Sequence, residues 1–207
     1  MSILDASTHT CYKETPFDLG RAMKWATMPE KEEIITTSIR GAPNYLIDNL
    51  RKLAKRHGST EWKIHYVILG NAKNWLLASN EWRAWDDLQE RLVGIESGVN
   101  IAEDDLDRVR RNARMFELQE IDDAMTGRAR QRNIRVDDDL CAQLGRIAEQ
   151  AEVTVNLVVQ ILTSMVMAEQ HGMDHAQTMK KTRDQFFRIL DRRTRTVEAL
   201  LDLWQHN

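Results

Sequence analysis

An apolar pattern in this chain recurs at a constant interval of 94 residues. Four apolar residues at helical spacing in a first copy match four in a second: Leu46 with Leu140, Leu50 with Leu144, Leu53 with Ile147, and Ala54 with Ala148. Each group follows a β-favouring run and precedes another apolar stretch at helical spacing. The interval therefore predicts a strand-helix-helix arrangement that occurs twice in one chain.

The first copy begins with the β-branched run at residues 34–40 (IITTSIR). Gly41-Ala42-Pro43-Asn44 should break this strand, since Pro favours the first turn of a helix. Gly58 should end that helix, and Ser59 or Thr60 can cap a second one. The first copy is therefore expected at residues 31–70.

The second copy, expected at residues 128–170, begins with the strand Gln131-Arg132-Asn133-Ile134-Arg135-Val136. Asp137 to Asp139 supply an N-cap and an acidic first turn, and Thr154 caps the second helix. The strands fit the interval less well than the helices, because Ile39 meets Ile134 only at an offset of 95. We therefore expect one extra residue near Gly41-Ala42.

The remaining segments read as helical or peripheral. With only nine glycines and three prolines, the composition favours helices over a turn-rich β fold. Residues 1–30 are interpreted as a mobile arm or a peripheral packing segment. Residues 71–127 are interpreted as a helical acidic linker, with helices near 71–95 and 103–125 and a break near Ser97-Gly98.

Residues 171–207 form the last predicted segment, with a long helix over 174–204. Its apolar residues follow coiled-coil-like spacing with one charged interruption, which makes a homodimer or higher oligomer plausible. The stripe consists of Phe186, Leu190, Arg193, Val197, Leu200 and Trp204. The fold class predicted for the whole chain is mainly α with a short two-stranded antiparallel β-ribbon.

Charge is distributed unevenly, although the net charge is only −3. Residues 36–63 hold six basic residues against two acidic ones, and residues 126–136 hold four arginines and no acid. The intervening residues 86–124 hold 12 acidic residues against five arginines. Positive charge therefore gathers in the two predicted copies, separated by an acidic stretch.

Several classes of protein are disfavoured. Cys11 and Cys141 lie far apart and form no metal-binding pair, so a reducing, cytoplasmic compartment is expected. We also expect no signal peptide and no membrane-spanning segment. We expect no cofactor and no metal, since His171 and His175 lack a nearby third ligand. The six tryptophans are better explained by core packing than by base stacking. No nucleophile-base arrangement is found, so an enzyme is not expected.

The strand at residues 131–136 indicates where recognition could occur. A lone short strand is unstable in water and needs a partner strand. Alternation places Gln131, Asn133 and Arg135 on one face of it. Gln and Asn can pair bidentately with adenine, and Arg with guanine, in the major groove, which admits a two-stranded ribbon. The alternative reading is an exposed linker or helix start with solvated arginines.

These residues resemble the ribbon-helix-helix family of the Arc and MetJ type, over roughly residues 36–69 and 130–165. The resemblance implies base-reading residues on the outward strand faces: Gln131, Asn133, Arg135, Thr36, Ser38 and Arg40. It also implies phosphate contacts at the start of each second helix: Thr154, Val155, Asn156, Ser59, Thr60 and Lys63. Arg132 stands where the family has an inward apolar residue, and Glu152 where it has glycine.

The expected function is sequence-specific binding of double-stranded DNA, as a transcriptional repressor. A plasmid relaxosome or partition accessory protein would use the same DNA chemistry. A helical assembly or adaptor protein without DNA binding is the alternative from another class, favoured by the net negative charge and the C-terminal stripe. The two strands can pair within one chain or between two chains.

Overall fold

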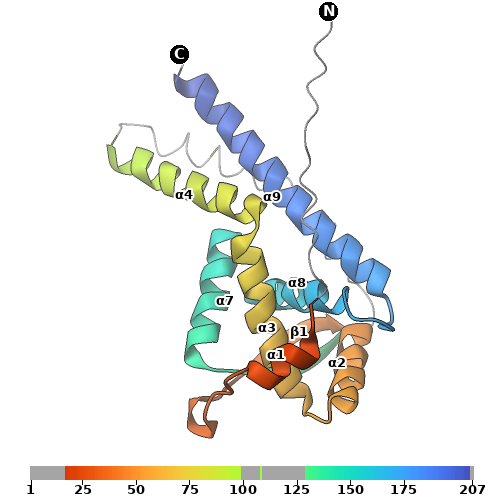
Figure 1. Ribbon diagram of the computed structural model, residues 1–207. Coiled ribbons are helices and arrows are strands. Elements are labelled where there is room, and N and C mark those ends of the chain that lie inside the picture. Colours follow the sequence, from red (N-terminus) through yellow and green to blue (C-terminus); the bar gives the residue numbers. More distant parts are fainter. Residues whose placement is uncertain (1–16, 99–107, 109–128, 206–207) are drawn as a thin grey trace, which may run out of the picture.

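The computed structural model describes residues 17–98, 108 and 129–205, and at 37–41, 93–98, 129–132 and 204–205 it describes the backbone alone. The protein is mainly helical, with one small two-stranded antiparallel sheet (Figure 1). The predicted helix over 103–125 lies outside the described residues. The elements, in chain order, are α1 (Leu19–Trp25), the 3-10 helix η1 (Lys31–Glu33), β1 (Ile35–Pro43), α2 (Asn44–Arg56), α3 (Glu61–Ala78), α4 (Asn80–Gly98), β2 (Ala129–Val136), α7 (Asp138–Gln150), α8 (Val155–Met167) and α9 (Ala176–Gln205).

The order strand-helix-helix occurs twice. We call β1, α2 and α3 unit one, and β2, α7 and α8 unit two. Helices α2 and α7 each have 13 residues and begin 94 residues apart. Helices α3 and α8 also begin 94 residues apart, but α3 has 18 residues and α8 has 13. The strands of the two units pair with each other within the same chain. The predicted interval therefore holds for the starts of both helices and for the end of the first helix in each unit, but not for the end of the second.

The turn between the two helices of each unit also has the same backbone structure in both units. Gly58 and Glu152, 94 residues apart, both adopt left-handed backbone conformations, with φ of 57° and 53°. The backbone hydrogen bonds around these two residues also correspond. In unit one, His57 N–H donates to Leu53 O and Ser59 N–H to Ala54 O, both at 2.9 Å. In unit two, Ala151 N–H donates to Ile147 O at 2.9 Å and Val153 N–H to Ala148 O at 2.8 Å. The glycine that ends the first helix in unit one is thus replaced in unit two by a glutamate held in the same conformation.

The ribbon contains an irregularity where the sequence predicts one. Antiparallel partners run from Ile35 opposite Val136 to Ile39 opposite Arg132, and then resume at Ala42 opposite Arg130. Two residues of β1 therefore oppose one residue of β2, as in a β-bulge. The extra residue expected near Gly41-Ala42 is confirmed. The expected break of the strand at Gly41 is wrong, because the bulge absorbs the extra residue and β1 continues to Pro43.

Side chains at helix starts follow the predicted chemistry in unit two. Asp137 caps α7 by accepting a hydrogen bond from the Leu140 N–H at 2.7 Å, and Thr154 caps α8 by accepting one from the Leu157 N–H at 3.2 Å. Thr60 is the residue before α3, as expected, but its side chain makes no capping bond. The hydroxyl cap is therefore present at only one of the two corresponding turns.

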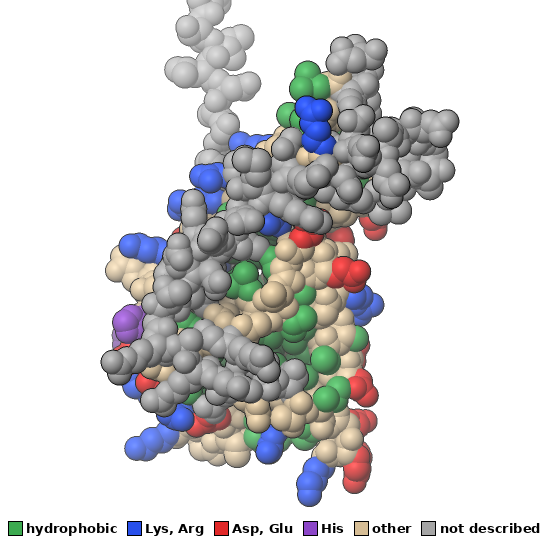
Figure 2. Space-filling model, turned by 180° about the vertical axis from the view of Figure 1, so that it is seen from behind, with side chains coloured by type: hydrophobic (Ala, Val, Ile, Leu, Met, Phe, Trp, Pro, Cys, Tyr) green, Lys and Arg blue, Asp and Glu red, His purple; other side chains and the backbone are tan. Residues whose placement is uncertain are grey.

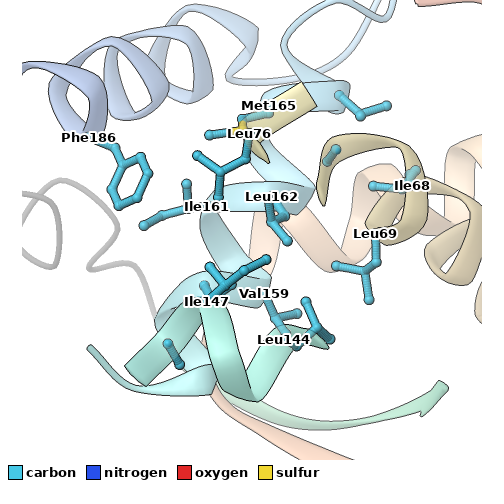
Figure 3. Close-up of a cluster of buried hydrophobic side chains, with 14 of the residues drawn as sticks. Ile68, Leu69, Leu76, Leu144, Ile147, Val159, Ile161, Leu162, Met165 and Phe186 are labelled. Carbon is cyan, nitrogen blue, oxygen red and sulfur yellow. The ribbon is translucent and has the colours of Figure 1, made fainter. Parts of the chain in front are cut away.

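Both units contribute to one core. All eight apolar residues that carry the repeat are buried. Figure 3 shows Ile68 and Leu69 of α3 facing the same interior as Leu144 and Ile147 of α7 and Val159 and Leu162 of α8. Each strand also contacts the second helix of the other unit, β1 with α8 and β2 with α3. The units are thus interleaved rather than placed side by side.

One predicted helix is divided. The sequence suggested a single helix over 71–95, but α3 continues to Ala78 and α4 begins at Asn80. Ser79 separates them, and its Oγ accepts a hydrogen bond from the Trp82 N–H at 3.2 Å. The break lets Trp82 and Trp85 turn inward, where each is about 2 % exposed. Core packing is confirmed for these two tryptophans.

The C-terminal helix α9 runs along α8 and α4 (Figure 1). Its predicted stripe faces these helices: Phe186, Leu190, Arg193 and Val197 are buried. Arg193 donates a hydrogen bond to the Ala151 carbonyl at 2.7 Å, which explains the charged interruption. The chain itself covers these four side chains, Leu200 is partly buried, and the side chain of Trp204 lies outside the description, so oligomerisation stays a prediction.

The described part of the N-terminal segment packs against the core. Leu19 of α1 is 1 % exposed. The rings of Phe17 and Trp75 pack edge to face, with their centres 5.7 Å apart. His171 and His175 lie in the loop before α9 rather than on one helix. In the described ranges, no single helix is long and apolar enough to cross a membrane.

Candidate nucleic-acid interface

The described side chains of the ribbon separate by face as the alternation predicts. On β2, Ile134 and Val136 are buried, whereas Asn133 and Arg135 are exposed. On β1, Thr36 is exposed and lies opposite Arg135 in the register. Paired residues of an antiparallel ribbon share a face. Thr36 and Arg135 therefore stand together on the solvent face, while the other face closes the core.

The other predicted base-reading residues are placed by the backbone alone. Ser38 pairs with Asn133, which puts both at the centre of the ribbon on that outward face. Arg40 falls in the bulge, and Gln131 lies opposite it between Arg132 and Arg130. Arg132 pairs with Ile39, in register with the inward positions. The register thus brings the two predicted sets of reading residues together along one ribbon.

The predicted phosphate-binding residues lie at the starts of α3 and α8. Thr60, Thr154 and Val155 are exposed, whereas Ser59, Lys63 and Asn156 are partly buried. The first N–H groups of a helix lack partners within that helix and carry partial positive charge, so they favour anions. Both turns therefore have the backbone chemistry that a phosphate requires.

An open groove joins the ribbon to one of these turns. Asn133 and Arg135 of β2 line it together with Ser59 and Thr60, and the remaining lining residues are Arg51, Ala54, Glu61 and Trp62. Residues of unit two thus lie beside the helix start of unit one. Thr154, Val155 and Asn156 lie at the other helix start and are not part of this groove.

Charged groups in the groove are partly paired. Arg51 forms ion pairs with Glu61 and Asp48, both at 3.2 Å and both exposed to solvent. Such exposed pairs contribute only about 0–1 kcal/mol and can reorganise when a polyanion approaches. The Lys63 ammonium lies 5.7 Å from the centre of the Trp62 ring. This side of the groove is therefore lined by the cation Arg51 of α2 and by the acid Glu61 and the aromatic ring of Trp62 at the start of α3.

The corner where β2 meets α7 has a different character. The Tyr66 hydroxyl donates a hydrogen bond to Asp137 at 2.5 Å, which connects α3 to this corner. Burial and the neighbouring carboxylates, Asp137 first among them, raise the pKa of Tyr66, so the hydroxyl keeps its proton in more alkaline solution than an ordinary tyrosine does. Asp138 and Asp139 add two exposed negative charges in the first turn of α7.

No family model, curated protein or solved structure matches this chain.

The interface includes residues that the sequence did not single out. Arg51 and Trp62 line the groove, although Trp62 was assigned to core packing and Arg51 was counted only in the regional charge. The basic run on the outward side of α2 was the available signal for Arg51. Trp62 had none, because it shares a groove with Asn133 only when β2 packs against α3 of unit one.

Proposed function

We propose that the chain is a sequence-specific double-stranded DNA-binding protein of the ribbon-helix-helix kind, acting as a transcriptional repressor. In this proposal the two units of a single chain build one DNA-reading ribbon. The carrying observation is the pairing of β1 with β2 in a register that sets Thr36 against Arg135 and Ser38 against Asn133. These residue types supply hydrogen bonds to base edges in the major groove.

The arrangement of the helices supports the same proposal. Ribbon residues Asn133 and Arg135 share a groove with the start of α3, so bases and a flanking phosphate could be engaged together. Phosphate contacts set the position of a protein on the duplex, whereas base contacts provide specificity. The buried residues Ile134 and Val136 hold β2 against the core and leave the polar side chains outward.

Selection from a pool of random duplexes tests this function. We expect an enriched sequence that the chain binds more tightly than random DNA in a titration at fixed salt. Arg135→Ala should weaken binding to the enriched duplex by about 1–3 kcal/mol and leave binding to random DNA nearly unchanged.

Arg195→Ala is the matched control, since Arg195 is an exposed arginine of α9 and lies outside the ribbon. This variant should keep the full preference for the enriched duplex. Failure to enrich any duplex, or equal specificity in Arg135→Ala and the unaltered chain, would contradict the proposal. In the first case a helical assembly protein without DNA binding would be favoured.

A further inference from the structure

The two units present opposite charges at corresponding surfaces. Helix α2 carries four basic residues (Arg51, Lys52, Lys55 and Arg56) against Asp48, whereas α7 carries three acidic residues (Asp138, Asp139 and Glu149) against Arg146. All of these side chains are exposed. Figure 2 shows acidic side chains along the edge on the α7 side and basic side chains at the opposite edge, on the α2 side. A polyanion would therefore be attracted to one side of the pseudo-symmetric body and repelled by the other.

A similar imbalance lies near the ribbon, at the turn between the two helices of each unit. Arg51 of α2 is ion-paired with Glu61 at the start of α3, where Lys63 also lies, and the residues 94 positions after Arg51 and Lys63 are Gly145 and Leu157. The two cations at this turn thus belong to unit one, whereas Arg135, on the ribbon itself, belongs to unit two. At the start of α8 the backbone N–H groups and the Thr154 cap remain, without a corresponding cation at those two positions.

The ribbon itself is not symmetric. An offset of 95 relates the strands, so Thr36 corresponds to Gln131 and Ser38 to Asn133. One strand therefore offers short hydroxyls where the other offers amides, which differ in reach and in the bases they favour. The bulge between Ile39 and Ala42 distorts one end of the ribbon, while the end with Thr36 and Arg135 is regular.

From these three differences we propose that the chain recognises a non-palindromic DNA site in one fixed orientation, with the duplex anchored on the α2 side. This inference rests on the proposed function. The symmetry of a DNA site reflects the symmetry of the protein that reads it, and two-fold dimers read palindromes. A single chain with unlike halves reads two unlike half-sites, and only the half-site flanked by α2 gains strong phosphate contacts.

The probes for the test are the enriched duplex and two derivatives of it, in each of which one half-site is repeated as an inverted repeat. We expect one chain per duplex, a non-palindromic enriched sequence, and at least tenfold weaker binding to one derivative than to the other. Hydroxyl-radical protection of the enriched duplex should extend further on one flank.

Charge variants then locate the anchored side. Arg51→Gln combined with Lys55→Gln should weaken the salt dependence of binding. The negative slope of log affinity against log salt should become smaller in magnitude by roughly 1.8, about 0.9 for each phosphate that the protein no longer neutralises. Arg146→Gln is the matched control, since it removes an exposed cation of α7. It should leave the slope within error.

The outcomes separate the two proposals. Three results would overturn the proposal of a non-palindromic site and leave DNA binding intact. They are a palindromic enriched site, equal affinities for both derivatives, and a reduction of the salt slope in Arg146→Gln as large as that per charge removed from α2. A chain that binds no duplex at low salt would overturn both. In that case the basic side of α2 would more simply suit an acidic protein partner.

Discussion

The two strand-helix-helix units share a backbone and differ in what they attach to it. Their helix starts and turn hydrogen bonds correspond at an interval of 94 residues, and the apolar residues that carry the repeat are buried in both. Inside the core, however, His65 of unit one corresponds to Val159, and Thr163 of unit two corresponds to Leu69. Packing thus requires the same backbone turns and the same apolar positions in both units, whereas other buried positions differ between the units.

The unlike pair forms a buried hydrogen bond between the units. His65 Nε2 and Thr163 Oγ1 lie 2.9 Å apart, and the Thr163 hydroxyl donates its own proton to the Val159 carbonyl at 2.6 Å. His65 must therefore donate from Nε2. If two chains paired like with like, His65 would face Leu69 and have no such partner. An unsatisfied buried polar group costs about 1–3 kcal/mol, so the pair favours pairing within one chain.

The largest predicted effect tests whether the units share one core. Ile68 of α3 and Leu162 of α8 correspond in the repeat and are both fully buried. Either residue changed to Ala should lower the free energy of unfolding by about 2–5 kcal/mol, because each change leaves a cavity. Urea denaturation followed by circular dichroism should show one cooperative transition in both variants.

Leu77→Ala is the control for these variants, since Leu77 lies on α3 but is 38 % exposed. It should change the free energy of unfolding by much less. Two separate transitions, or a change in only half of the signal, would show that the units unfold independently. The conclusion that both units share one core would then be wrong.

A smaller effect follows from the ionisation of His65. Burial lowers its pKa from 6.5 to about 4, so the folded chain holds the ring neutral. The unfolded chain takes up a proton below pH 6.5, and the free energy of unfolding therefore falls as the pH decreases from 6.5 towards 4. The slope approaches about 1.4 kcal/mol per pH unit, so about 2 kcal/mol should be lost between pH 7 and pH 5.

His65→Val isolates this contribution by installing the residue that unit two has at the corresponding position. The Thr163 hydroxyl keeps its bond to the Val159 carbonyl in this variant. The difference in urea midpoint between pH 7 and pH 5 should shrink by the amount attributed to His65. An identical pH dependence in both proteins would mean that other groups cause it.

The sequence predicted those features of the fold that depend on local chemistry. Asp137 and Thr154 were identified as caps because their side chains reach backbone N–H groups three residues ahead, and the structure has both bonds. The mismatch between the offsets 94 and 95 predicted the extra residue near Gly41-Ala42, but not that β1 would continue to Pro43 and absorb this residue as a bulge.

Features that depend on distant contacts were missed. Nothing around Ser79 forbids a continuous helix, and the break serves Trp85, whose Nε1 donates to the Gln150 carbonyl at 2.9 Å. The groove was predicted incompletely for the same reason, because Trp62 and Asn133 line one groove only after β2 packs against α3. Alternation identifies the outward face of a strand, but it does not identify the neighbours of that face.

The smallest predicted effect concerns the two left-handed turn residues, Gly58 and Glu152. Residues with a Cβ are strained in this conformation by about 1–2 kcal/mol, whereas glycine is not. A Cβ at Gly58 would meet no atom within 4 Å, so Gly58→Ala should lower the free energy of unfolding by about 1 kcal/mol through backbone strain alone. Glu152→Gly should raise it by about 0.5 kcal/mol, since the added freedom of the unfolded chain offsets part of the relief.

Gly145→Ala provides a control of opposite sign. Gly145 lies within α7, and a Cβ there also meets no atom within 4 Å. Alanine should therefore stabilise the helix by about 1 kcal/mol. If Gly58→Ala stabilised the chain as Gly145→Ala does, the turn of unit one would not be held in the left-handed conformation. If Glu152→Gly were destabilising, the contacts of the Glu152 side chain would outweigh its strain, and the glutamate would be a stabilising substitution in unit two.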